Sequence, residues 1–168
     1  MDEVFRYVVQ FLHVFSGVLW VGGGLYTIFV QTPALLATPP QARGPALGQI
    51  VPRQVNYLLR LGEVTVALGV LNVFASGKAS LLQEALGSRW SLAIVVGAIL
   101  ALTLLAIGHA ILKPSAVRLL ELGPRAAGGD ASAGAEAAAI MARLKTIGYV
   151  QIALGLLIIG AMVLARFS

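Results

Sequence analysis

The sequence has no cysteine, only two histidines and few charged residues. The absence of cysteine excludes a disulfide framework, thiolate metal sites and the attachment motif of c-type haem. Charged residues make up 11% of the chain, whereas a soluble domain carries roughly 25%. A chain so poor in charge has too little polar surface to cover itself in water, so we expect no soluble domain of any size.

Apolar residues are abundant and are collected in long runs. They make up 58% of the chain, and the mean hydropathy is +0.89. A bilayer core needs about 20 mostly apolar residues per helix, and the alternation typical of a β-barrel is missing. The sequence therefore predicts an all-α integral membrane protein, with residues 1–168 forming one four-helix up-down bundle. The expected spans are about 4–36, 54–76, 89–113 and 143–165.

Prolines and glycines mark the expected connections between the spans. Gly77 and Gly87 bracket a short second connection. The third is expected to run over 114–142, with an interfacial helix at 117–122 and either a mobile stretch or a helical lead into the fourth span at 128–139. The first connection is expected to hold five prolines: Pro33, Pro39, Pro40, Pro45 and Pro52.

Basic residues are distributed unevenly between the two expected sides of the membrane. The net charge of +5 comes from residues that flank the apolar runs, so we expect no nucleic-acid partner. Four basic residues lie on the side of the termini: Arg6, Lys78, Arg89 and Arg166. Seven lie on the side of the long connections: Arg43, Arg53, Lys113, Arg118, Arg125, Arg143 and Lys145. The positive-inside rule predicts a multi-pass protein of the inner (plasma) membrane with both termini outside.

Glycines recur at seven-residue spacing in three of the expected spans. Seven residues are close to two helical turns, so both members of a pair lie on one helix face. Such faces permit close helix packing in lipid, and they can also leave room for a flat cofactor. The pairs are Gly17 with Gly24, Gly62 with Gly69, and Gly148 with Gly155.

A histidine, a tryptophan and two glycines form a stripe on the first expected span. His13, Gly17, Trp20 and Gly24 follow i, i+4, i+7 and i+11 spacing, which places them on one helix face. A neutral imidazole can bind haem iron, and glycines let a porphyrin approach. Ionisable side chains within a span are costly and are functional candidates. We interpret the stripe as a candidate haem b site, with ordinary bundle packing as the alternative for Trp20.

The second histidine, His109, lies near the inner end of the third span. Helices 1 and 3 are parallel in an up-down bundle, so the two histidines are expected to differ in depth by about 20 Å. One iron with bonds near 2 Å cannot bind both. Either two haems or one haem plus a proton or quinone site at His109 is expected. Met162, on the antiparallel fourth span, is expected at the level of His13 as a second candidate ligand.

Further polar residues are expected near the inner end of the bundle. Arg60 and Glu63 lie one turn apart and can form an ion pair, and Arg60 can also meet a haem propionate. The expected lining of one polar cavity consists of Gln31, Asn56, His109, Lys113, Tyr149 and Gln151.

The segment 11–35 resembles a known family. It reads Phe-Leu-His-Val-Phe-Ser-Gly-Val-Leu-Trp-Val-Gly-Gly-Gly-Leu-Tyr, followed by Phe29-Val-Gln-Thr-Pro33. This pattern is similar to the first span of the membrane domain of cytochrome-c-linked bacterial urate oxidases. Its His-x6-Trp core also resembles the copper-resistance protein D family and the HemJ-type protoporphyrinogen oxidases. The resemblance implies a b-type haem in a four-helix bundle, with His13 at the position of the first-span histidine.

The function expected from these observations is that of a membrane-bound b-type cytochrome, which transfers electrons within or across the bilayer. The expected partners are the lipid bilayer and an electron donor or acceptor such as a quinone or a cytochrome c. A second copy of the chain can supply a missing axial ligand. The alternatives are a HemJ-like haem-dependent porphyrinogen oxidase, a protein that handles copper or another metal, and a purely structural partner subunit. The chain can also be a redox subunit of an oxidoreductase.

Overall fold

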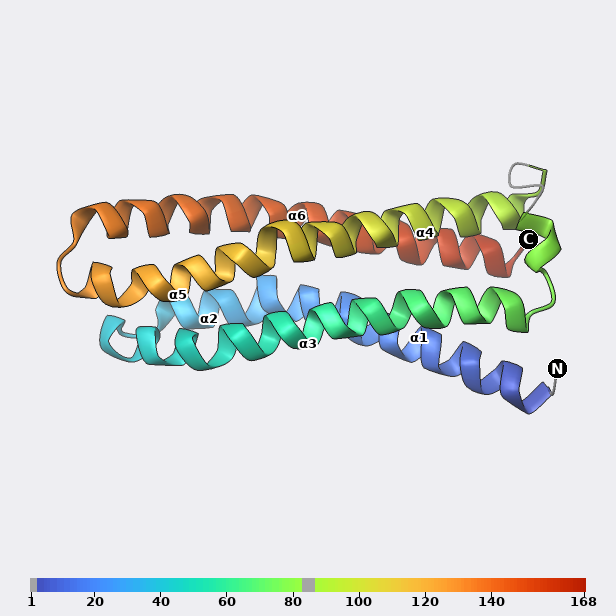
Figure 1. The fold of residues 1–168 in the computed structure, drawn as a ribbon, viewed down its shortest axis with the longest axis horizontal. Helices are drawn as coiled ribbons and strands as arrows, with labels where there is room; N and C mark the ends of the chain where they lie inside the picture. Colours follow the sequence, from blue (N-terminus) through green and yellow to red (C-terminus); the bar gives the residue numbers. More distant parts are fainter. Residues whose placement is uncertain (1–2, 83–86) are drawn as a thin grey trace.

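The protein is an all-α bundle of four long helical segments (Figure 1). The computed structural model describes residues 3–82 and 87–168. The first segment contains α1 (Glu3–Tyr26), the π-helical turn η1 (Thr27–Gln31) and α2 (Thr32–Ala37). The second is α3 (Pro40–Ala75), and the short 3₁₀ helix η2 (Ala79–Leu82) follows it. The third contains α4 (Arg89–Ile107), the π-helical turn η3 (Gly108–Leu112) and α5 (Lys113–Ala127), and the fourth is α6 (Ala131–Arg166).

All four segments are long and apolar enough to cross a membrane, which confirms the predicted fold class. The candidate spans within them contain 35, 34, 39 and 36 residues, the second running from Ala42 to Ala75. At 1.5 Å per residue they are about 50–58 Å long, whereas a hydrocarbon core is about 30 Å thick. Many large apolar side chains point away from the protein; Phe11 and Phe15, for example, stack on each other while at least half exposed. Such an outward apolar surface suits contact with lipid.

Consecutive segments are antiparallel and form two hairpins. The first segment packs along α3, and α4 and α5 pack along α6. The hairpins meet through α1 with α6 and through α3 with α4 and α5. The start of α1, the C-terminus and η2 lie at one end of the bundle, and the connections at 38–39 and 128–130 lie at the opposite end (Figure 1).

The first connection is much shorter than the sequence predicts. Of the five prolines assigned to it, only Pro39 lies outside a helix, beside Thr38. Pro40 begins α3, and proline is well tolerated there because the first N–H groups of a helix have no helical partner. Pro45 and Pro52 lie inside the helix. The Arg43 guanidinium ties the connection together by donating to the carbonyls of Leu36 at 2.6 Å and Thr38 at 2.9 Å.

The third connection is also short, because helix continues on both sides of it. The stretch 117–122 belongs to α5, which extends the third segment and is no separate interfacial helix, and 131–139 leads helically into the fourth span. Asp130 caps α6 by accepting from the Ala133 N–H. The Ser132 hydroxyl, this N–H and Arg125 hold the pKa of Asp130 well below its usual range, so the cap is ionised at neutral pH.

The two π-helical turns explain how the first and third segments pass through a proline. Each turn ends two residues before one: η1 before Pro33 and η3 before Pro114. Proline lacks an N–H, and its ring clashes with the carbonyl four residues earlier. A π turn widens the helix locally and relieves this conflict without ending it. Pro33 and Pro114, expected at helix ends, therefore lie inside continuous segments.

Glycines of α3 receive large side chains of α1. A Cβ built on Gly62 would lie 2.7 Å from two ring atoms of Trp20, and one on Gly69 would lie 3.0 Å from Cε1 of His13. His13 and Trp20 are separated by seven residues, as are the two glycines. The match of spacings on antiparallel helices seats both rings at once.

Glycines of α6 receive the opposite side of the first segment in the same way. A Cβ on Gly155 would lie 3.1 Å from Cγ1 of Val21, and one on Gly148 would overlap Ile28. Five of the six paired glycines thus face a neighbouring side chain, and only Gly24 faces open space. Close helix packing, the first of the two interpretations of the glycine pairs, accounts for these five.

Filling one of these glycine positions is expected to destabilise the bundle. Gly62→Val should lower the free energy of unfolding by about 1–3 kcal/mol, the usual cost of overpacking, because the Trp20 ring must move. Gly160→Val is the matched control, since nothing lies within 4 Å of its Cβ position. Denaturant unfolding in detergent micelles measures both. Equal stability of the two variants would contradict the packing role of Gly62.

Candidate functional site

His13 is held against α3 by one hydrogen bond and one glycine. Its Nδ1 lies 3.0 Å from the carbonyl oxygen of Thr65, and its ring rests on Gly69. A carbonyl oxygen only accepts, so Nδ1 carries the proton and Nε2 keeps its lone pair. Among the residues that the structure describes, none hydrogen-bonds to this Nε2. The ring is therefore fixed in the tautomer and orientation that a metal ligand requires.

The predicted stripe lies on the packed face of α1. Val9, Ser16 and Trp20 on this face are buried, and His13 is half-buried among them. Thr65 Cγ2 lies 3.5 Å from the Cβ position of Gly17. The space beside Gly17 is therefore occupied by α3, whereas the space beside Gly24 is open. The stripe offers a cofactor the free nitrogen of His13 and the open surface at Gly24.

Two independent helix registers place Met162 at the level of His13. Val21 packs on Gly155, so Met162, seven residues further along α6, is level with residue 14 of antiparallel α1. Gly62 of α3 contacts Leu105 of α4, so Gly97, eight residues earlier on α4, is level with residue 70 of α3. The Met162 side chain packs on Gly97. Both registers give the same depth for Met162 and His13.

The two histidines lie at different depths, as expected, but closer than expected. His13 contacts Gly69, whereas Gly108 contacts Leu59 and His109 reaches Glu63. These positions on α3 are six to ten residues apart, which is about 9–15 Å along the helix rather than about 20 Å. The difference in depth is smaller because α1 begins ten residues before His13 and α4 begins twenty residues before His109. The two histidines are therefore offset by only about ten residues along the parallel helices. It still prevents both from binding one iron.

His109 belongs to a charged cluster on the outside of the bundle. Its Nε2 lies 3.1 Å from Oε1 of Glu63, and the other carboxylate oxygen of Glu63 accepts from Arg60 at 2.9 Å. The Arg60–Glu63 pair confirms the prediction for these two residues. The side chains of His109 and Glu63 are 43% and 34% exposed, and that of Arg60 is 81% exposed. His109 sits in the η3 turn, so the widened backbone presents it towards α3.

The single polar cavity expected near the inner end is divided into two shallow grooves. His109 and Lys113 line one along η3 and α5, and Gln31 lines the other between the first segment and α3. Asn56, Tyr149 and Gln151 line neither groove. The prediction of one cavity was wrong because depth along a helix does not determine the face on which a side chain lies.

A hydrogen-bonded chain of polar side chains crosses from the η1 turn to α3. Gln31 donates to Gln54 at 2.6 Å, Gln54 donates to the Thr27 hydroxyl, and Thr27 donates to the Gly23 carbonyl at 2.7 Å. Sequence reasoning missed Gln54, Thr27 and also Thr65, whose carbonyl orients His13. Gln54 had a signal, because it lies at the start of an expected span and near the depth of Gln31.

Comparison with other proteins adds no further constraint. The chain matches no protein family model, no curated protein and no solved structure. Within residues 3–82 and 87–168, no three histidine, aspartate or glutamate side chains lie close enough to hold a metal ion.

The pairing of His109 with Glu63 is open to direct measurement. A double-mutant cycle with His109→Gln and Glu63→Gln should give a coupling free energy of about 0.6 kcal/mol, the average for polar pairs between membrane helices. The matched cycle of His109→Gln with Asn72→Ala should be additive, because Asn72 bonds Gln10 at the far end of α3. Unfolding in detergent provides the free energies. An additive first cycle would show that the ion pair does not form.

Proposed function

We propose that the protein is a b-type cytochrome of the plasma membrane with His13 as an axial ligand of its haem. The observation that carries the proposal is the bond from His13 Nδ1 to the Thr65 carbonyl, which leaves Nε2 available for iron. The first-span resemblance supports the same residue and the same cofactor.

The residues of the chain position the ligand and exclude water. Gly69 lets the His13 ring approach α3, and Thr65 fixes the rotation of the ring. Trp20, two turns further along the same face, is buried against Gly62 and closes the inner side of the stripe. A bound haem b supplies one-electron transfer at its iron. Met162, which packs on Gly97 at the same depth, would be a second residue able to hold the group.

Copper handling is the second candidate function, and the same pair of residues favours it. Copper accepts both imidazole and thioether ligands, and Cu(I) especially favours the thioether. His13 and Met162 are level with each other by both helix registers. The optical spectrum separates the two functions, because only the haem protein has a Soret band.

Haem content is expected to depend on His13 and not on His109. His13→Ala should abolish most of the Soret absorbance and bound iron while the four-span protein still inserts. His109→Ala is the matched control, because its imidazole is held by Glu63 at a different depth. It should keep the His13 haem and lose at most a second haem. Haem-to-protein ratio and the reduced-state spectrum provide the measurement.

The outcomes of this pair of variants are distinct. An unchanged Soret band and iron content in His13→Ala would overturn the assignment of His13. Complete loss of haem in each single variant would indicate that both histidines share one iron, which the helix registers do not allow. Copper in the native protein without a Soret band would favour the second candidate function.

Both termini are proposed to face the outside of the membrane. The bundle end with the 38–39 and 128–130 connections carries most of the basic residues, and the positive-inside rule places this end in the cytoplasm. A C-terminal alkaline phosphatase fusion should be active, and a C-terminal green fluorescent protein fusion should be dark. The opposite pattern of activity and fluorescence would reverse the orientation.

A further inference from the structure

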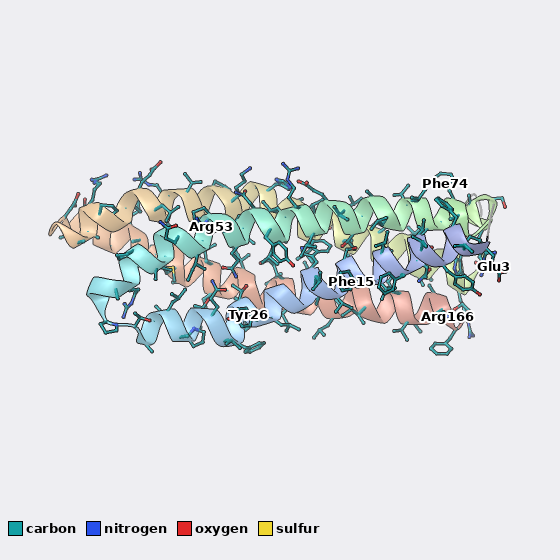
Figure 2. The ribbon with its side chains drawn as sticks, turned by 90° about the horizontal axis from the view of Figure 1, so that it is seen from below. Glu3, Phe15, Tyr26, Arg53, Phe74 and Arg166 are labelled. Atoms are coloured by element: carbon teal, nitrogen blue, oxygen red, sulfur yellow. The ribbon has the colours of Figure 1, made fainter. Side chains whose placement is uncertain are left out.

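A groove between the first segment and α3 has the composition of a binding site for a small ring. It is lined by Gly23, Tyr26, Gln31, Ile50, Arg53, Gln54, Tyr57 and Leu58. The floor is apolar, since Gly23 and Leu58 pack directly on each other. Figure 2 shows Tyr26 and Arg53 on neighbouring helices in the same section of the bundle. Ligand sites combine such an apolar floor with a few convergent polar groups.

The polar groups of the groove have hydrogen-bonding capacity to spare. Each glutamine amide nitrogen carries two hydrogens, and Gln31 and Gln54 each use one in the chain that ends at Thr27. Tyr26 and Tyr57 are 56% and 53% exposed. Neither phenol hydroxyl has a bonded partner among the described side chains. Amide donors and flat phenol rings together suit a planar ligand with carbonyl oxygens.

The charge in the groove favours a neutral head group over a phosphate. Arg53 is the only charged residue of the lining, and its guanidinium already donates to the Gln49 carbonyl and side chain at 2.7 and 2.6 Å. Phosphates are bound by several strong donors or by bidentate arginine. Four neutral polar residues surround this single engaged cation. A ligand with carbonyl acceptors matches them better.

The groove lies between two segments that are long and apolar enough to span a membrane, so a ligand dissolved in the bilayer could reach it laterally. A ligand that arrives by this route is lipid-soluble. It lies away from His13, since Leu58 and Gly69 are eleven residues apart on α3, about 16 Å.

We propose that this groove binds the ring of a lipid quinone, with its carbonyl oxygens accepting from Gln31 and Gln54 and its ring between Tyr26 and Tyr57. The choice of a quinone among ring amphiphiles rests on the proposed redox function. The groove would then be the place where the cytochrome meets its mobile electron carrier. This assigns a role to the η1 turn, which supplies Thr27 and Gln31.

Binding of a short-tailed ubiquinone analogue to the full chain in phosphatidylcholine nanodiscs tests the proposal by calorimetry. Tyr57→Leu and Gln54→Leu should each weaken binding about tenfold or more. Tyr149→Leu should leave it unchanged, and it is a matched control because Tyr149 is 50% exposed in α6 and outside the groove. Tyr57 is exposed, so its removal leaves the fold intact, which thermal unfolding verifies.

Three results would overturn the proposal. The first is that the native chain binds no quinone, and the second is that Tyr57→Leu and Tyr149→Leu weaken binding equally. The third is that added phosphatidylglycerol competes with the quinone and that Arg53→Gln abolishes this competition. The third result would identify a phosphate head-group site. The Soret band of the same samples separates this proposal from the cytochrome assignment. Haem without quinone binding would contradict only the proposal for the groove. Quinone binding without haem would contradict only the cytochrome assignment.

Discussion

Lipid surrounds the four segments and gives them no hydrophobic reason to associate, so the bundle depends on close van der Waals packing between helices. Glycine provides it, because the absence of a side chain lets a neighbouring ring approach the backbone. Gly62 and Gly69 hold Trp20 and His13, and Gly155 holds Val21 on the other side of α1. The first segment is thus fixed between α3 and α6. The same contacts that assemble the bundle also set the position of its candidate ligand.

The backbone constraint of the bilayer determines where the remaining polar groups lie. Every N–H and C=O within lipid needs a partner inside the protein, so a proline in a span requires a local solution. The π turns before Pro33 and Pro114 are that solution. Each also carries polar side chains, Thr27 and Gln31 in η1 and His109 in η3. These side chains pair with α3, through Gln54 and Glu63.

The sequence was sufficient to predict the helical class, the four spans and the Arg60–Glu63 pair, because each follows from composition or local spacing. The first and third connections were predicted to be too long, because a proline usually marks a helix end. Pro33 and Pro114 instead follow π turns, and Pro45 and Pro52 lie inside α3. The partners of His13 were not predictable, because Thr65 contributes a backbone carbonyl, and every residue has one. The helix face on which Gln31 lies could not be predicted, because it is defined only by the packing of the helices.

The two histidines differ in chemistry because they differ in partner. His13 donates to a backbone carbonyl through Nδ1 and is half-buried, and its second ring nitrogen is free. His109 points its Nε2 at the Glu63 carboxylate on the outside of the bundle, so that nitrogen is engaged. A metal ligand needs a free lone pair, whereas a proton-exchanging group needs an acceptor close by. The geometry thus leaves Nε2 of His13 free and pairs His109 with Glu63, and the proposed roles of the two residues rest on these features.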